Sequence, residues 1–309
     1  LNFDNVEVQR WMIEVCKYWI TEFQIDGFRF DAVWGVNARK PSFSKRLRNE
    51  LKSINPDVLM LAEDKPSHSV YQNGFDVAYD WTADTTWVSQ WSWQYQYHEQ
   101  KSFTIFNHPE VQLRAAMLND AIFENDSSRL PRLRFMENND LPRFINDHTI
   151  AQTRMVAALL FALDGVPMIY NGQEICFPIH PYSKGAFFQR SRSIASLDTT
   201  GMFNYYKKLI DLRSKHLALR RGKIAKVYES PAQGVLGFRR STGSDVIYVF
   251  INLANVSQSI DMQKVMDKTT RPATLVDLIT NGEFSFNKEV RQHTVSLPGY
   301  STCWFVLKK

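Results

Sequence analysis

The first 221 residues of this 309-residue chain alternate between strand-length segments and longer segments of helical periodicity. Strands are expected at 26–33, 58–62, 75–81, 133–137 and 166–170. The second of these is a continuous apolar run, which is typical of a parallel strand covered on both faces. The repeat predicts a parallel α/β architecture, and polar residues at the strand ends favour a (β/α)₈ barrel over an open sheet.

Helices are expected before, between and after these strands, at 8–23, 41–55, 109–125, 149–163 and 202–219, with a loop after residue 33. Asp4 or Asn5 can cap the first helix, Pro41 suits the first turn of the second, and Gly165 lies where the fourth should end. Five strands are fewer than the eight of a closed barrel. We therefore expect the chain to begin partway through a barrel whose first three strands lie upstream.

Beyond residue 221 the sequence changes to short strand-like runs separated by Gly, Asn and Ser turns, at 235–238, 246–252, 273–278 and 301–307. This pattern is typical of an antiparallel β-sandwich. The expected division is therefore residues 1–221 as strands four to eight of a catalytic barrel and residues 222–309 as an all-β sandwich domain.

Composition excludes several classes of function. The net charge is +5, but the basic residues are spread along the chain, so no nucleic-acid partner is expected. Cys16, Cys176 and Cys303 lie far apart, so neither a metal site nor a disulfide framework is indicated. No run is apolar enough to span a membrane, and a chain beginning Leu-Asn-Phe-Asp carries no readable targeting signal, so localisation stays open.

Three carboxylates, Asp31, Glu63 and Asp140, each follow a different predicted strand. The C-terminal ends of barrel strands form one edge, which is where barrel active sites are built. Arg29 precedes Asp31 by two residues, so the two share a strand face, and the arginine would keep that carboxylate ionised. Paired carboxylates at this edge suit retaining glycoside hydrolysis; the alternative is a structural ion pair with unrelated acids at loop starts.

Aromatic residues are concentrated just after the third predicted strand. Trp87, Trp91 and Tyr95 recur at intervals of four, as do Trp93 and Tyr97. The pattern suits either a sugar-stacking platform or a helical packing stripe. We favour packing, because aromatic residues at helical spacing more commonly serve a core.

Four segments resemble the α-amylase family, glycoside hydrolase family 13: GFRFDA at 27–32, LAE at 61–63, FMENND at 135–140 and GVPMIYNGQE at 165–174. By this resemblance the nucleophile is Asp31 with Arg29 as its partner, the acid/base is Glu63, and the transition-state-stabilising aspartate is Asp140. The resemblance covers essentially the whole chain, including a C-terminal sandwich. It implies an α-glucan or maltooligosaccharide substrate, and no cofactor in this segment, although calcium could be bound in the full-length enzyme.

Two departures from the family pattern narrow the expected type. Asn139 stands where the family usually has histidine, and an amide can still donate to a sugar hydroxyl. Trp34 and Gly35 replace the Lys-His pair of many α-amylases. These changes favour a neopullulanase, cyclomaltodextrinase or α-glucosidase type. Trp34 could line an acceptor subsite, or it could pack on its own barrel as a loop residue.

Two other functions compete with a retaining α-glucan hydrolase. A non-catalytic, amylase-like interaction or glucan-binding module usually lacks the acids that this chain retains. An unrelated sugar-phosphate barrel enzyme would need a phosphate loop after its late strands, where Glu174 would repel a phosphate. The linkage cleaved, transfer versus hydrolysis, and homo-oligomerisation remain open. The expected partners are the glucan and the missing barrel segment.

Overall fold

The computed structural model describes residues 1–80, 105–124, 130–180, 183, 193–265, 274–285 and 294–308. The expected aromatic segment at 87–97 lies outside these residues.

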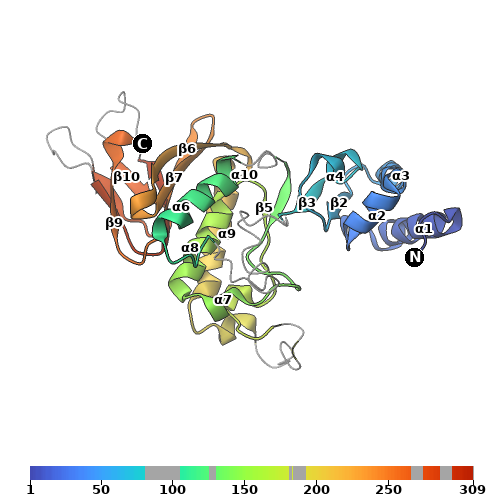
Figure 1. Ribbon diagram of the computed structural model, residues 1–309, viewed down its shortest axis with the longest axis horizontal. Coiled ribbons are helices and arrows are strands. Elements are labelled where there is room, and N and C mark those ends of the chain that lie inside the picture. The colour runs from blue at the N-terminus through green and yellow to red at the C-terminus, as the bar shows by residue number, and fades with distance from the viewer. Residues whose placement is uncertain are drawn as a thin grey trace.

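A five-stranded parallel sheet runs through the first part of the chain (Figure 1). Its strands are β1 (Gly27–Phe30), β2 (Leu59–Ala62), β3 (Val77–Tyr79), β4 (Arg132–Arg134) and β5 (Val166–Pro167). They lie side by side in chain order, and every neighbouring pair is parallel. This confirms the parallel strand-and-helix repeat expected from the sequence.

Helices precede, connect and follow these strands. They are α1 (Val6–Phe23), α2 (Val33–Arg39), α3 (Pro41–Ile54), α4 (His68–Gln72), α6 (Val111–Asn119), α7 (Phe144–Asp147), α8 (Ile150–Ala162), α9 (Met202–Lys215) and α10 (Leu217–Arg221). Asn5 caps α1 by accepting from the backbone N–H of Glu7 at 2.8 Å. Pro41 occupies the first turn of α3, and Thr149 with Gln152 forms a capping box at α8.

Several boundaries differ from those expected. The loop predicted after residue 33 is instead helix α2, which begins directly after a left-handed residue, Ala32. The strands predicted at 133–137 and 166–170 are shorter, because their later residues turn into loops at the sheet edge. The helix predicted at 202–219 is interrupted at His216, whose extended backbone places its Nδ1 3.0 Å from Asp245.

The C-terminal part is antiparallel. Strands β6 (Lys223–Ser230), β7 (Val235–Thr242), β8 (Asp245–Asn252), β10 (Thr274–Asp277), β11 (Glu283–Ser285) and β13 (Ser301–Leu307) form one sheet, and β9 (Gln258–Asp261) pairs with β12 (Thr294–Leu297). Both sheets contribute to one buried cluster that includes Phe250, Ile260, Val295 and Phe305. Side chains alternate across β13, so Trp304 faces the opposite way from Phe305.

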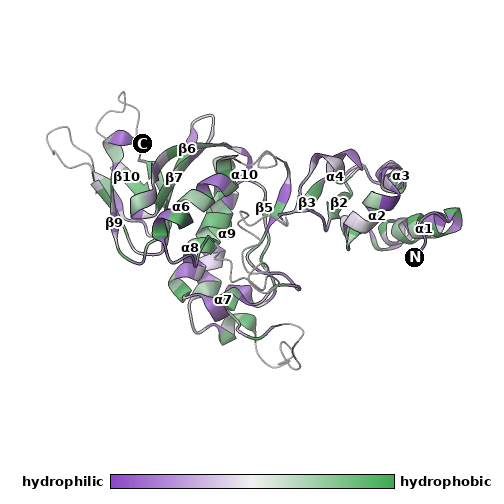
Figure 2. Ribbon diagram, in the orientation of Figure 1, coloured by the Kyte–Doolittle hydropathy of each residue, from purple (hydrophilic) through white to green (hydrophobic). Residues whose placement is uncertain are grey.

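That opposite face packs on helices of the first part. One core cluster joins α6, α8 and α9 to residues of β7, β8 and β13, including Phe238, Val249 and Trp304. Helix α8 is buried along ten of its thirteen residues, and Figure 2 shows it hydrophobic along much of its length. The change in secondary structure near residue 221 therefore does not coincide with a gap in the hydrophobic core.

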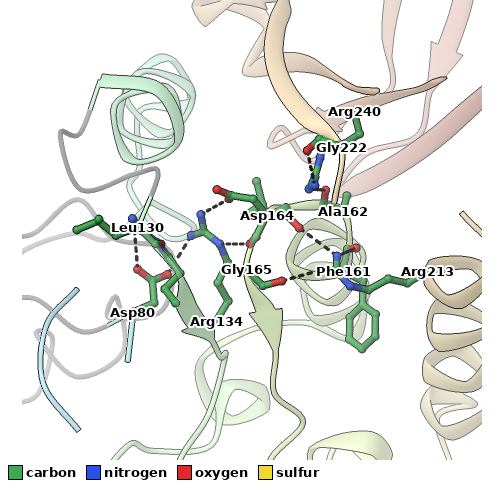
Figure 3. A network of polar contacts seen from close by, with 12 residues as sticks. Asp80, Leu130, Arg134, Phe161, Ala162, Asp164, Gly165, Arg213, Gly222 and Arg240 are labelled. Carbon is green, nitrogen blue, oxygen red and sulfur yellow. Dashed lines mark hydrogen bonds and ion pairs between the residues drawn. The ribbon is translucent and has the colours of Figure 1, made fainter. Parts of the chain in front are cut away.

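A buried polar network crosses the same region (Figure 3). Arg134 on β4 donates to Asp80 at 3.0 Å and to Asp164 at 2.7 Å. Arg213 on α9 donates to the carbonyls of residues 161, 163 and 165, and Arg240 on β7 donates to the carbonyl of residue 162 at 2.7 Å. The last carbonyls of a helix have no partner within it, so these guanidiniums satisfy the end of α8.

Candidate active site

The register of the parallel sheet decides which side chains meet. Arg29 is paired with Leu61, and Tyr79 is paired with Leu133, so these four side chains lie on one face. The helix-covered face carries the alternate residues, among them Met60 and Ala62 of the core. Asp31 and Glu63 follow β1 and β2 directly, which places both at the carboxyl edge of the sheet.

Arg29 joins the two acids. One terminal nitrogen of its guanidinium pairs with Asp31, and the other lies 2.5 Å from Oε1 of Glu63. Its Nε donates to the hydroxyl of Tyr79 at 3.3 Å. Burial opposes the charge on Arg29, but the hydrogen bonds to Tyr79 and Asp31 raise its pKa, so it stays cationic. A guanidinium group spans only a few ångströms, so the carboxylates of Asp31 and Glu63 that bind it lie close together.

The turn after β1 adds a second link between the acids. Ala32 adopts φ 45°, a left-handed conformation that is uncommon for a residue other than glycine. In this conformation its backbone N–H donates to Oε2 of Glu63 at 2.5 Å. The strained residue follows Asp31 directly, so one turn presents Asp31 and holds Glu63.

Asp31 and Glu63 differ in exposure, and the environment of Glu63 shifts its pKa. The side chain of Asp31 is 79% exposed, and that of Glu63 is 16% exposed. Burial raises the pKa of Glu63, and the charges of Asp31 and Asp140 raise it further, against the Ala32 N–H and Arg29, which lower it. A carboxyl group that keeps its proton to higher pH beside an exposed carboxylate can serve as an acid while its neighbour serves as a nucleophile.

Asp140 belongs to the loop after β4. Its backbone N–H donates to Oδ1 of Asn138 at 2.8 Å, and Asn139 donates its side-chain amide to Oδ1 of Asp140 at 3.0 Å. The side chain of Asp140 is exposed, and its charge acts on the pKa of Glu63. The three predicted carboxylates therefore face one site. Asn139 was predicted to donate to a sugar hydroxyl, which stays a prediction; here its amide donates to Asp140.

Trp34 lies on α2, not in the loop that was predicted. Its side chain is 62% exposed and lines a cavity of about 270 Å³ together with Ala32, Val36 and Phe3. Because Ala32 lines the same cavity and contacts Glu63, Trp34 stands beside the site. Its assignment to an acceptor subsite stays a prediction.

Sequence reasoning did not identify the buried pair behind Asp140. Glu137 and Arg143 are 2% and 1% exposed, and they form an ion pair at 2.8 Å. The only sequence signal was a carboxylate three residues before Asp140 and an arginine three after it.

No group of three His, Cys, Asp or Glu side chains suited to a metal ion occurs among the residues that the structure describes. Within the same residues, no helix is both long and apolar enough to cross a bilayer.

A comparison with known protein families identifies the family to which this chain belongs. The family description "Alpha amylase, catalytic domain" matches residues 1–194, which include Asp31, Glu63 and Asp140. The chain belongs to the α-amylase family, glycoside hydrolase family 13. The resemblance carried by the four sequence motifs is therefore confirmed.

Curated members of the family are longer than this chain. A cyclomaltodextrinase of Geobacillus thermopakistaniensis is 25% identical over 312 residues, covering 97% of this chain and 48% of that protein. A maltogenic α-amylase of Bacillus acidopullulyticus is 26% identical over 274 residues, covering 81% and 41%. The chain thus spans about half the length of these relatives.

Solved structures agree on the fold. A native debranching enzyme of Nostoc punctiforme superposes with a TM-score of 0.73 at 22% identity, covering 98% of this chain and 62% of that chain. The maltogenic α-amylase AmyB of Thermotoga neapolitana gives 0.72 at 18% identity, covering 100% and 68%. The fold is amylase-like, with a barrel sheet and a C-terminal sheet domain.

Proposed function

We propose that this protein is a retaining glycoside hydrolase acting on α-glucans or maltooligosaccharides. The observation that carries the proposal is the single guanidinium of Arg29 holding Asp31 and Glu63 together. Retaining glycosidases need their two carboxyl groups about 5–5.5 Å apart, whereas inverting enzymes need room for a water between them. The relatives named cyclomaltodextrinase and maltogenic α-amylase support the substrate class.

In the proposed first step, an oxygen of Asp31 attacks the anomeric carbon while the bond from that carbon to the leaving oxygen breaks. Glu63 gives its proton to the leaving oxygen, for which its raised pKa suits it. The product is a glycosyl ester on Asp31. In the second step Glu63 takes a proton from water, whose oxygen attacks the same carbon and releases Asp31.

Asp140 and Arg29 have supporting roles in this mechanism. Positive charge develops on the sugar in the oxocarbenium-like transition state. The exposed carboxylate of Asp140 would stabilise that charge and bind sugar hydroxyls. Arg29 orients Asp31 through their ion pair until Asp31 attacks. A non-catalytic module is not favoured, because such a module would not require three carboxylates and a shared arginine at one edge.

We also propose that the barrel is completed by three further strands, and that the C-terminal sheets act as a sandwich domain fixed to it. Within the described residues, β1 and β5 each pair along one edge only. Helix α1 exposes Trp11, Tyr18 and Phe23 by 58%, 54% and 55%. Unpaired strand edges and aromatic faces of this kind are normally covered. The greater length of the relatives supports a segment that covers them.

Azide rescue tests the roles of the two acids in the complete polypeptide. With a nitrophenyl α-glycoside, Asp31→Gly should lose turnover, and added azide should attack the anomeric carbon directly and give a β-glycosyl azide. Glu63→Ala should still form the glycosyl-enzyme, because nitrophenolate leaves without a proton. Azide should then attack that intermediate and give an α-glycosyl azide.

The anomer of the azide product, read by NMR, decides the assignment. The unmodified enzyme should release the α-anomer first, since two inversions restore the configuration. A β-anomer as the first product, or the same azide anomer from both variants, would refute the double-displacement proposal. Glu22→Ala, at an exposed position of α1, serves as the control and should behave as the unmodified enzyme.

A further inference from the structure

Asp140 lies in a loop whose base is closed by a buried side chain. Oε1 of Glu137 accepts from the backbone N–H of Phe144 at 2.8 Å, and Oε2 accepts from Arg143 at 2.8 Å. One carboxylate thus joins the two ends of a loop with Asp140 near its middle. Asp140 itself is exposed, so its position depends on how firmly this loop is held.

Arg143 also ties this loop to the next one. Its Nε donates to the carbonyl of Ile179 at 3.0 Å, and its second terminal nitrogen donates to the carbonyl of Asn171 at 2.9 Å. The guanidinium carbon lies 5.2 Å from the ring centroid of Tyr170. The planar fork of arginine can satisfy a carboxylate and two carbonyls at once, which a lysine ammonium cannot do with the same geometry.

The pair is held in a low-dielectric setting. Burial raises the pKa of Glu137, while Arg143 and the Phe144 N–H oppose that rise. A charged group buried beside a fully hydrogen-bonded partner has few alternative positions, because each alternative would leave a charge unpaired. The loop after β4 and the loop after β5 are therefore held in one arrangement.

We propose that Glu137 and Arg143 are positioning residues that fix Asp140 opposite Asp31 and Glu63. This inference rests on the proposed function, since it assigns the pair a role in the same site. Neither side chain reaches the solvent from which a glucan would bind, so neither is expected to contact substrate. Their effect should pass through the placement of Asp140.

The test compares Arg143→Met, Arg143→Lys and Glu137→Gln in the complete polypeptide. A misplacement of about 1 Å at a reacting group can cost about 100-fold in rate, so Arg143→Met should lower kcat by about 100-fold with KM changed far less. Arg143→Lys should recover part of the loss, since an ammonium still pairs with Glu137. If Arg143→Met does not fold, Glu137→Gln gives the same comparison, with kcat again falling more than KM.

Arg213→Met is the matched control. It also removes a buried guanidinium bonded to backbone carbonyls, but at the end of α8 and not beside Asp140. It should lower the melting temperature and leave kcat per folded molecule unchanged. Equal losses of kcat in Arg143→Met and Arg213→Met, or full activity in Arg143→Met, would overturn the inference. Absence of glycosidase activity in the unmodified enzyme would instead refute the proposed function.

Discussion

The two faces of the parallel sheet each carry an arginine shared by two carboxylates, yet the two groups differ in exposure. On one face Arg29 is 28% exposed and holds Asp31, which is 79% exposed, and Glu63. On the other, Arg134 is 1% exposed and holds Asp80, which is fully buried, and Asp164, which is 31% exposed (Figure 3). The difference lies in the arginine and in one carboxylate: Arg29 and Asp31 reach solvent, whereas Arg134 and Asp80 are enclosed by protein.

The protonation of the carboxylates follows this difference. Glu63 meets two other acids as well as Arg29, and its pKa is raised, first by burial and then by their charges. Burial also opposes the charge of Asp164, but Arg134 outweighs it and lowers the pKa of Asp164. The acids around Glu63 favour its protonated form, which can act in chemistry, whereas Arg132 and Arg240 join Arg134 in keeping Asp164 ionised.

Replacing Arg29 should affect catalysis more than any other change in this comparison. Arg29→Met removes the cation that pairs with Asp31 and orients it, so kcat should fall by about 10²–10³-fold, as when an electrostatic partner of a reacting group is lost. Steady-state kinetics on a maltooligosaccharide measure the loss. Because Arg29 is partly exposed, the urea midpoint should change little, and a large loss of stability would contradict the contrast between the faces.

Replacing Arg134 should have the opposite result. Arg134→Met removes the ion-pair partner of Asp164 and leaves Asp80 with Arg132 at 3.5 Å, and breaking a buried pair typically costs about 3–5 kcal/mol. Urea unfolding measures the change, and kcat per folded molecule should be retained. Arg10→Met, which removes an exposed pair with Glu7, is the control and should not change the urea midpoint.

The sequence allowed a better prediction of the sheet face that carries Arg29 than of the face that carries Arg134. The period-two alternation at 26–33 placed Arg29 and Asp31 on one side, and the ends of the strands located Glu63 and Asp140. The pairing of Arg134 with Asp80 and Asp164 depends on the register of β3, β4 and β5, which no local pattern specifies.

Other features were not predicted from the sequence because they depend on tertiary contacts. Helix α2 contains Gly35 and Asn37, both weak helix formers, so its existence depends on packing with α3. The burial of Glu137 depends on the loop after β5, which is distant in sequence. The shared core of α8 with β7, β8 and β13 likewise joins segments that composition had assigned to two domains. That division at residue 221 stays a prediction.

The pH dependence of kcat/KM should change when one acid is removed from the group formed by Asp31, Glu63 and Asp140. The charge of Asp140 raises the pKa of Glu63, so Asp140→Asn should lower it. Glu63 must be protonated to act as the acid, and a lower pKa means that the proton is lost at lower pH. The alkaline limb of kcat/KM, which reports the free enzyme, should therefore move to lower pH. A limb that stayed in place, or moved upward, would show that Asp140 does not act on Glu63.

The smallest expected effect concerns Asn139. Its amide donates to Asp140 at 3.0 Å, and a hydrogen bond to a charged group contributes about 1.5–3 kcal/mol in a buried setting but less where water can replace it. Because Asp140 is exposed, we expect Asn139→Ala to lower kcat by only about 3–10-fold, with most of the loss compensated by solvent. Asn139→Asp keeps the size of the side chain but places a second carboxylate beside Asp140, and repulsion should make it the worse of the two variants. Steady-state kinetics at low ionic strength should rank them in that order. The reverse ranking would mean that Asn139 acts through a contact with substrate and not through Asp140.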